Sequence, residues 1–192
     1  MSDQTQNAPD LLDLLDGAAA EAERIVGNVR PDQWDLPTPC TEWSVRDVVN
    51  HLVGGNLMNV AAFDGPTAFS DEDHLGDDPV AALAASNRAI AERLRRPGAM
   101  GETATFPYGT FPGQLVATFR VIDLLNHGWD IAKATGQPTD LAPDLHTAGL
   151  ALARPMMAHV DRTANPAFGL EQPAPAGASA ADAFAAFMGR AQ

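Results

Sequence analysis

The spacing of apolar residues is the strongest constraint on this fold, because they recur every three or four positions in several long segments. In residues 10–30, leucine, alanine, isoleucine and valine keep this spacing, with acidic residues between them. That period matches the 3.6 residues of a helical turn, so the segment predicts an amphipathic helix. Pro31 follows and ends it. The same pattern returns four times, and the chain is therefore expected to be all-α.

Local signals place the other elements. Ser44 and Asp47 form a capping-box-like pair, which predicts a helix from Ser44 to about Phe63. Asp78 and Pro79 are a typical N-cap and first helical residue. Further helices are expected at 79–95, 112–135, 140–159 and 179–189, with a possible hairpin in 96–113 and an extended linker in 165–179. The helix at 140–159 is expected to be capped near Asp140 or Pro143 and to be interrupted by Pro155. The four longest helices fit a four-helix bundle with short extra helices.

Length and charge narrow the class of protein. The 192 residues suffice for one domain spanning 1–192, and the formal net charge of −13 disfavours nucleic acid and anionic membrane surfaces as partners. The single cysteine excludes an intramolecular disulfide. Residues 1–16 lack the basic region of a secretory signal, and no apolar run reaches the roughly 18 residues that span a bilayer. We expect a cytoplasmic protein, and the alanine-rich faces are compatible with a homodimer.

Asp123 and His127 lie four residues apart, so they share one face of the predicted fourth helix. Asp130 follows on nearly the same face, and all three flank an apolar stripe formed by Leu115, Ile122, Leu125 and Trp129. A carboxylate and an imidazole are costly there unless they are paired or bind a metal. Taken alone, the pair is better explained as an ion pair at the edge of the bundle.

His51 strengthens the case for a metal site. It lies beside the apolar stripe of the second helix and is followed by Gly54 and Gly55, each of which costs a helix about 1 kcal/mol relative to alanine. The glycines make sense if a neighbouring helix or a ligand approaches that face closely. The alternative is a core histidine bonded to a carbonyl, with glycines that serve helix packing.

Two histidines and one carboxylate supply three ligands and leave a position for water or substrate. That is the pattern of catalytic zinc sites, and it also matches non-haem iron, so the residue types do not fix the metal. Zinc is the first expectation, and cobalt, nickel or manganese could also bind.

Two segments resemble a known family: PTPCTEWSVRDVVNHLVGGN and VIDLLNHGWDIAKATGQP. Together with the ending FGLEQPAPAGASAADAFAAFMGR, they are similar to the DinB-like superfamily, and within it to the actinobacterial group related to mycothiol-dependent maleylpyruvate isomerase. The resemblance implies a four-helix bundle with one metal on His51, Asp123 and His127. Two departures count against maleylpyruvate isomerisation itself: the isomerase has glutamate where this chain has Asp123, and it carries a second α/β domain.

The resemblance also implies thiol chemistry. A free thiol has a pKa near 8.5, and coordination to zinc deprotonates it. Mycothiol would then attack an electrophilic substrate, as in a transferase or isomerase. The alternatives are a metal- or small-ligand-binding stress protein without catalysis, and a hydrolase that uses metal-activated water.

Three further residues are candidates around the site. Cys40 precedes the second helix and can be either a reactive thiol near the mouth of the site or, as we favour, a buried structural cysteine. Asp130 can orient His127 or His51 without binding the metal itself, or it can be a helix-cap partner or part of a surface salt bridge. Arg120 can receive an anionic substrate, as can Arg46, although pairing with Asp123 is the simpler expectation. Two further expectations concern His74 and the tryptophans. His74 is expected to be exposed.

The tryptophans are expected to pack in the bundle, with one of them lining the pocket.

Overall fold

A computed structural model describes residues 10–68, 70, 72–164 and 168–191. Most of the segment judged not to be a secretory signal, and the start of the predicted linker, lie outside these ranges. The elements are α1 (Leu11–Gly27), α2 (Val45–Ala61), α3 (Pro79–Leu94), β1 (Thr103–Phe106), β2 (Gly109–Pro112), α4 (Gly113–Thr135), α5 (Pro143–Met157) and α6 (Ala180–Phe187). Among the described residues, no helix has both the length and the apolar character that crossing a membrane requires.

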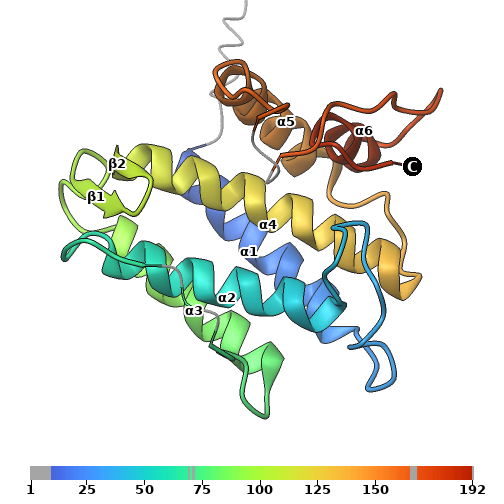
Figure 1. The fold of residues 1–192 in the computed structure, drawn as a ribbon, viewed down its shortest axis with the longest axis horizontal. Helices are drawn as coiled ribbons and strands as arrows, with labels where there is room; N and C mark the ends of the chain where they lie inside the picture. The colour runs from blue at the N-terminus through green and yellow to red at the C-terminus, as the bar shows by residue number, and fades with distance from the viewer. Residues whose placement is uncertain (1–9, 69, 71, 165–167, 192) are drawn as a thin grey trace, which may run out of the picture.

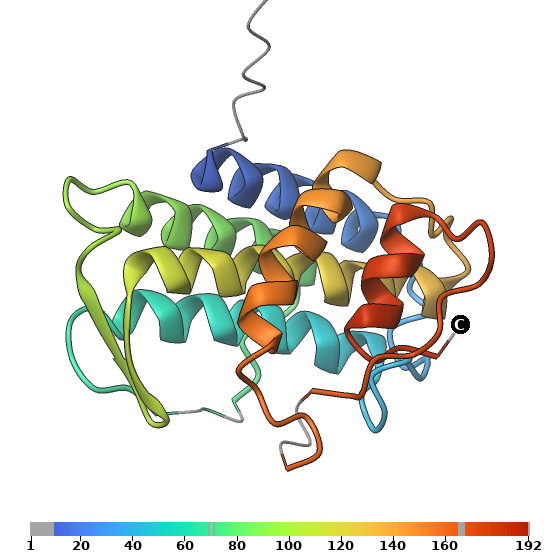
Figure 2. The same cartoon turned by 90° about the horizontal axis from the view of Figure 1, so that it is seen from above.

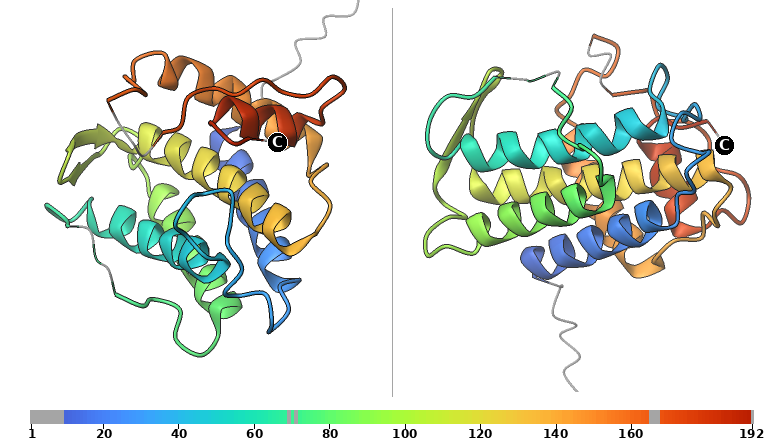
Figure 3. Two further views of the ribbon diagram at one scale, coloured as in Figure 1. Left: turned by 45° about the vertical axis from the view of Figure 1, so that its right-hand side comes forward. Right: turned by 90° about the horizontal axis from the view of Figure 1, so that it is seen from below.

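The four long helices α1 to α4 form a bundle (Figure 1). α1 packs against α3 and α4, and α2 packs against the same two helices from the other side. Figure 3 shows the four axes running alongside one another. Val49 and Leu52 of α2 and Leu124 of α4 are almost completely buried between them. The predicted all-α, DinB-like bundle with a small hairpin is confirmed.

α4 is covered on a second side by α5 and α6, which cross it (Figure 2). From Arg120 to Ala132, every residue except Asp123 is buried. The predicted stripe residues Ile122, Leu125 and Trp129 are buried, and burial also extends around the other faces of the helix. The reason is that α5 and α6 occupy a face of α4 that would be open to solvent in a bundle of four helices alone.

Most predicted helix ends are confirmed. Ser44 Oγ accepts a hydrogen bond from the Asp47 amide while the Asp47 carboxylate accepts one from the Ser44 amide, so the capping box is complete. Asp78 caps α3, with Pro79 at its first turn. Gly136, at φ +70°, ends α4 in the left-handed conformation that glycine adopts without strain. The hairpin is also present: β1 and β2 pair antiparallel with Ala104 opposite Phe111.

The fifth helix differs from the prediction at its C-terminal end and at Pro155. It begins at Pro143, one of the two predicted starts, and it continues through Pro155 to Met157. Pro155 lies in the last turn, where the loss of one amide donor disturbs few later hydrogen bonds. The expected interruption at Pro155 is wrong for this reason.

Candidate metal centre

The structure brings His51, Asp123 and His127 together where α2 meets α4. His51 Nε2 lies 3.4 Å from Asp123 Oδ2, and His127 Nε2 lies 3.5 Å from Asp123 Oδ1. One potential ligand atom from each of the three side chains lies within 4.8 Å of the other two. The His51 and Asp123 side chains are 37% and 27% exposed, whereas that of His127 is 8% exposed. The cluster therefore opens to solvent on the side of His51 and Asp123.

Arg120 holds the carboxylate of Asp123 from within the bundle. Its Nη1 donates to Asp123 Oδ2 at 2.8 Å, and its Nη2 donates to the Leu52 carbonyl at 3.3 Å. A Cβ placed at Gly55 would lie 2.8 Å from the same Nη1. Gly55 is therefore needed for close approach, as the sequence suggested, and the approaching group is the Arg120 guanidinium. Arg120 pairs with Asp123, the simpler of its two predicted roles.

Gly54 makes room for a loop residue. A Cβ at this position would lie 2.8 Å from Cδ2 of His74, whose amide donates to Asn50 Oδ1 at 2.8 Å. His74 is therefore half-buried against α2, and its predicted exposure is wrong. The acidic composition of the loop hid the contact, although Asn50 of α2 binds the loop backbone at Glu72 and His74 and the neighbouring Leu75 is buried in the core.

The electrostatics of the cluster keep Asp123 ionised. Burial by itself would raise the pKa of this carboxyl, but the His51 and His127 imidazoles and the Arg120 guanidinium outweigh burial and hold the pKa far below its usual value. The carboxylate is thus available as an anionic donor at neutral pH.

The other nitrogen of His127 faces Asp130. His127 Nδ1 lies 2.9 Å from Asp130 Oδ2, and Asp130 is completely buried. Arg190, beyond α6, donates to both oxygens of Asp130, from Nε at 2.8 Å and from Nη2 at 2.7 Å. Asp130 therefore contacts the imidazole nitrogen of His127 that faces away from Asp123, which is the supporting role predicted as one of its alternatives. Sequence reasoning missed Arg190, because no local pattern connects a residue of α4 with one 60 positions later, after the end of α6.

Cys40 lies behind the same imidazole. It forms a second group with His127 and Asp130 in which the potential ligand atoms also lie within 4.8 Å of one another. Burial raises the pKa of its thiol, which argues against the activated thiolate that a helix N-terminus can produce. Both Asp130 oxygens already accept hydrogen bonds from Arg190. Two of the three members of this second group, His127 and Asp130, are already hydrogen-bonded, so the first group is the better candidate for a metal.

Two aromatic residues border the cluster. The Trp43 ring centroid lies 4.7 Å from that of His51 and 5.8 Å from that of His127, so this tryptophan packs directly on both imidazoles. Tyr108, in the turn between β1 and β2, was missed by the sequence reasoning. Burial and then the Asp123 carboxylate raise the pKa of its phenol, so the hairpin turn lies within electrostatic reach of the cluster.

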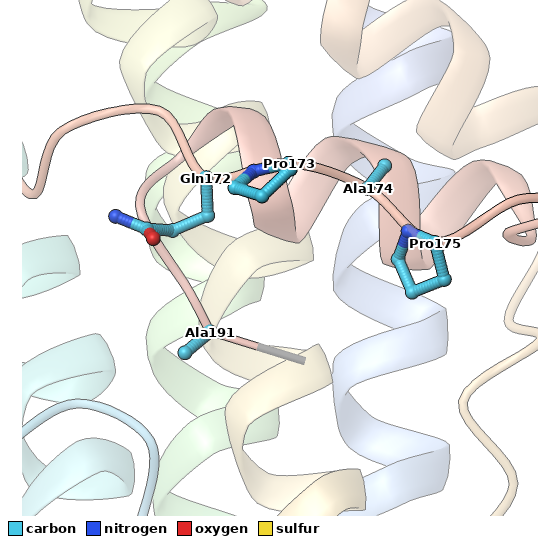
Figure 4. Close-up of a pocket in the computed structure, with 5 residues that line it drawn as sticks. All are labelled: Gln172, Pro173, Ala174, Pro175 and Ala191. Carbon is cyan, nitrogen blue, oxygen red and sulfur yellow. The ribbon is translucent and has the colours of Figure 1, made fainter.

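Other polar features lie elsewhere. Arg46 pairs with Asp73 at 2.7 Å on the surface. His146 is buried beside α6, with its Nδ1 3.2 Å from the Ala142 carbonyl. The hollow in Figure 4 is formed by residues 172–175, which precede α6, and by Ala191, which follows it, and these five residues carry no ionisable side chain. None of these features competes with the α2–α4 cluster.

The sequence is similar to known proteins over most of its length. A family model described as the mycothiol maleylpyruvate isomerase N-terminal domain matches residues 15–132. The chain belongs to this family. The matched range of the mycothiol maleylpyruvate isomerase N-terminal domain includes His51, Asp123 and His127, whereas Arg190 lies outside it.

Two relatives come from Mycobacterium tuberculosis. They are described as uncharacterized protein MT0763 of strain CDC 1551 and uncharacterized protein Rv0738 of strain H37Rv. Each is 39% identical to this chain over 166 residues, which covers 86% of this chain and 90% of the relative. No solved structure matches the chain.

Proposed function

We propose that the protein binds one divalent metal, zinc in the first place, through His51, Asp123 and His127. We further propose that it uses this metal to activate a thiol, mycothiol, for attack on an electrophilic substrate. The observation that carries the proposal is the convergence of these three side chains from α2 and α4, with ligand atoms within 4.8 Å of one another. Family membership supports mycothiol as the thiol.

The donor set fits a metal with an open position. Two imidazoles and one carboxylate leave at least one coordination position of a tetrahedral ion for another ligand. With Nδ1 of His127 facing the Asp130 carboxylate, its Nε2 is on the Asp123 side and is free to donate a lone pair. The partial exposure of His51 and Asp123 leaves a route by which a substrate can approach.

The charge balance favours an anionic ligand. Arg120 neutralises Asp123, Arg190 neutralises Asp130, and the two imidazoles are neutral when they act as ligands. A bound divalent ion would therefore bring two positive charges that these buried groups do not compensate. When bound, such an ion supplies a strong preference for the thiolate over the thiol. This excess charge supports thiol activation over a purely structural metal.

Metal analysis tests the first half of the proposal. Wild-type protein, stripped with a chelator and reloaded with zinc, is expected to retain one equivalent after gel filtration. His51→Ala and His127→Ala are expected to retain far less. His159→Ala is the matched control, because His159 is exposed and lies outside the cluster. Equal zinc in all four proteins would contradict the assigned ligands.

Thiol consumption tests the second half. Mycothiol and monochlorobimane are incubated with zinc-loaded and with zinc-stripped protein, and conjugate formation is followed by fluorescence. We expect faster conjugation with the loaded protein and none of this gain with His127→Ala. If several electrophiles give only the zinc-free rate although zinc is bound, the thiol role is wrong and a non-catalytic binding protein remains. Cleavage of activated esters without added thiol would point instead to a hydrolase.

A further inference from the structure

We infer that Arg190 is a positioning residue for the candidate metal centre, acting on His127 through Asp130. The inference deepens the proposed function and rests on it. It starts from a chain of three buried side chains: the Arg190 guanidinium, the Asp130 carboxylate and the His127 imidazole. Arg190 and Asp130 are 9% and 0% exposed, so solvent can replace neither partner.

The contact between Arg190 and Asp130 is bidentate, so it restricts the orientation of the carboxylate. Nε and Nη2 donate to different oxygens of Asp130, which fixes the plane of the carboxylate as well as its position. Oδ2 then lies 2.9 Å from Nδ1 of His127. A carboxylate in this position requires Nδ1 to carry the proton, which leaves the lone pair on Nε2. Nε2 is the atom that faces Asp123.

A tight turn after α6 places Arg190 beside Asp130. Gly189 has φ +95°, and a Cβ at this position would lie 2.6 Å from the backbone of Gly169. The Arg190 amide donates to the Ala185 carbonyl at 2.9 Å. The tail is thus fixed at the end of α6, and the Arg190 side chain turns inward to Asp130. The orientation of a ligand on α4 is in this way set from a segment outside the matched family range.

Zinc affinity measured by competition with a chromophoric chelator tests the inference. Arg190→Gln removes the two-pronged contact, and loss of such a supporting partner is expected to weaken zinc binding about 10- to 100-fold. Arg190→Lys keeps the charge without the planar fork, and it is expected to lie between wild type and Arg190→Gln. It serves as the second variant if Arg190→Gln does not fold.

Arg162→Gln is the matched control. Arg162 anchors the same tail, because its Nη2 donates to the Phe187 carbonyl at 2.7 Å, but it does not contact Asp130. We expect this variant to lower the unfolding temperature without changing zinc affinity. If Arg162→Gln weakens zinc binding as much as Arg190→Gln does, the tail acts only through stability and the inference is wrong.

Nitrogen NMR of the histidine side chains in metal-free protein gives a readout that a merely stabilising arginine would not move. Wild type is expected to show His127 as a single tautomer, with a protected Nδ1 proton. Arg190→Gln is expected to lose that protection or to show mixed tautomers. An unchanged His127 signal in a folded Arg190→Gln protein would overturn the inference.

The two proposals fail separately. If wild-type protein binds no zinc, the proposed function is wrong, while the His127 signal in metal-free protein still decides what Arg190 does. If wild type binds zinc and Arg190→Gln binds it equally well, the metal site stands and the role of Arg190 is wrong.

Discussion

Gly54 and Gly55 show how far a single sequence position can be interpreted. Their poor helix propensity indicated close approach to α2, and the structure supplies the approaching groups, the His74 ring and the Arg120 guanidinium. The sequence could not name these groups, because they come from a loop and from α4. The sequence shows that a helix position needs a small residue, but which group approaches that residue depends on tertiary packing.

Gly55→Ala is expected to destabilise the protein although alanine favours helix. The added Cβ displaces Arg120, whose hydrogen bond to a charged group contributes about 1.5–3 kcal/mol, against a helix gain of about 1 kcal/mol. We expect a net loss of roughly 1 kcal/mol in urea unfolding. Gly27→Ala is the control, because nothing lies within 4 Å of its Cβ position, and it should gain about 0.4–1 kcal/mol. Equal gains in both variants would contradict the Arg120 contact.

His146 predicts a pH dependence of stability. Burial lowers the pKa of its imidazole, and hydrogen bonds with the backbone, together with Glu21 of α1, only partly oppose the shift. In the unfolded chain this imidazole is protonated as the pH falls through about 6.5, whereas in the folded protein it stays neutral to lower pH. The free energy of unfolding therefore falls as the pH drops from 7 to 5. His146→Leu should flatten this part of the wild-type profile in urea unfolding. Parallel profiles for the two proteins would refute the assignment.

Helix ends were predicted best where a side chain closes a local hydrogen bond. Ser44 with Asp47, Asp78 with Pro79, and Gly136 each act within a few residues, so their patterns are readable in the sequence. The fifth helix was predicted less well, because its first residue is preceded by Ala142, which offers no cap, and because Pro155 lies inside it. There the packing of α5 on α4 and α6 outweighs the local signals.

Ser44→Ala tests the capping box of α2. Loss of the side-chain acceptor is expected to cost about 1 kcal/mol at neutral pH. Hydrogen bonds from the Ser44 side chain and then its backbone lower the pKa of Asp47, so this contribution is present above about pH 4 and is lost as the pH falls through the lowered pKa. The stability difference between Ser44→Ala and wild type should therefore narrow in acid. A difference independent of pH would show that Asp47 takes no part.

The assembled fold contains the features that no local pattern could reveal. The sequence predicted the ligand residues, the bundle and the hairpin, but not the second cover over α4 or the contact of Arg190 with Asp130. Both depend on where α5, α6 and the tail pack after the bundle has formed. The three candidate ligands could be assigned to one predicted site from the sequence, because they lie on the two helices with the clearest motifs.

Zinc removal is expected to lower the unfolding temperature. A ligand that binds only the folded state at 100 times its dissociation constant adds about 2.7 kcal/mol, which corresponds to roughly 5–10 °C for a chain of this size. Scanning calorimetry with zinc and with a chelator should show this shift for wild type. His127→Ala should show none. A shift of equal size in His127→Ala would place the bound metal elsewhere.

The double cover over α4 has a consequence for exchange kinetics. Amide protons along the buried middle of this helix can reach solvent only when the whole fold opens, whereas amides near the ends of α1 can exchange through local fraying. We therefore expect slow exchange for the backbone that carries Asp123 and His127, and faster exchange for α2, which carries His51 and is not covered by α5 and α6. Any bound ion should leave by loosening of α2, at a rate faster than global unfolding.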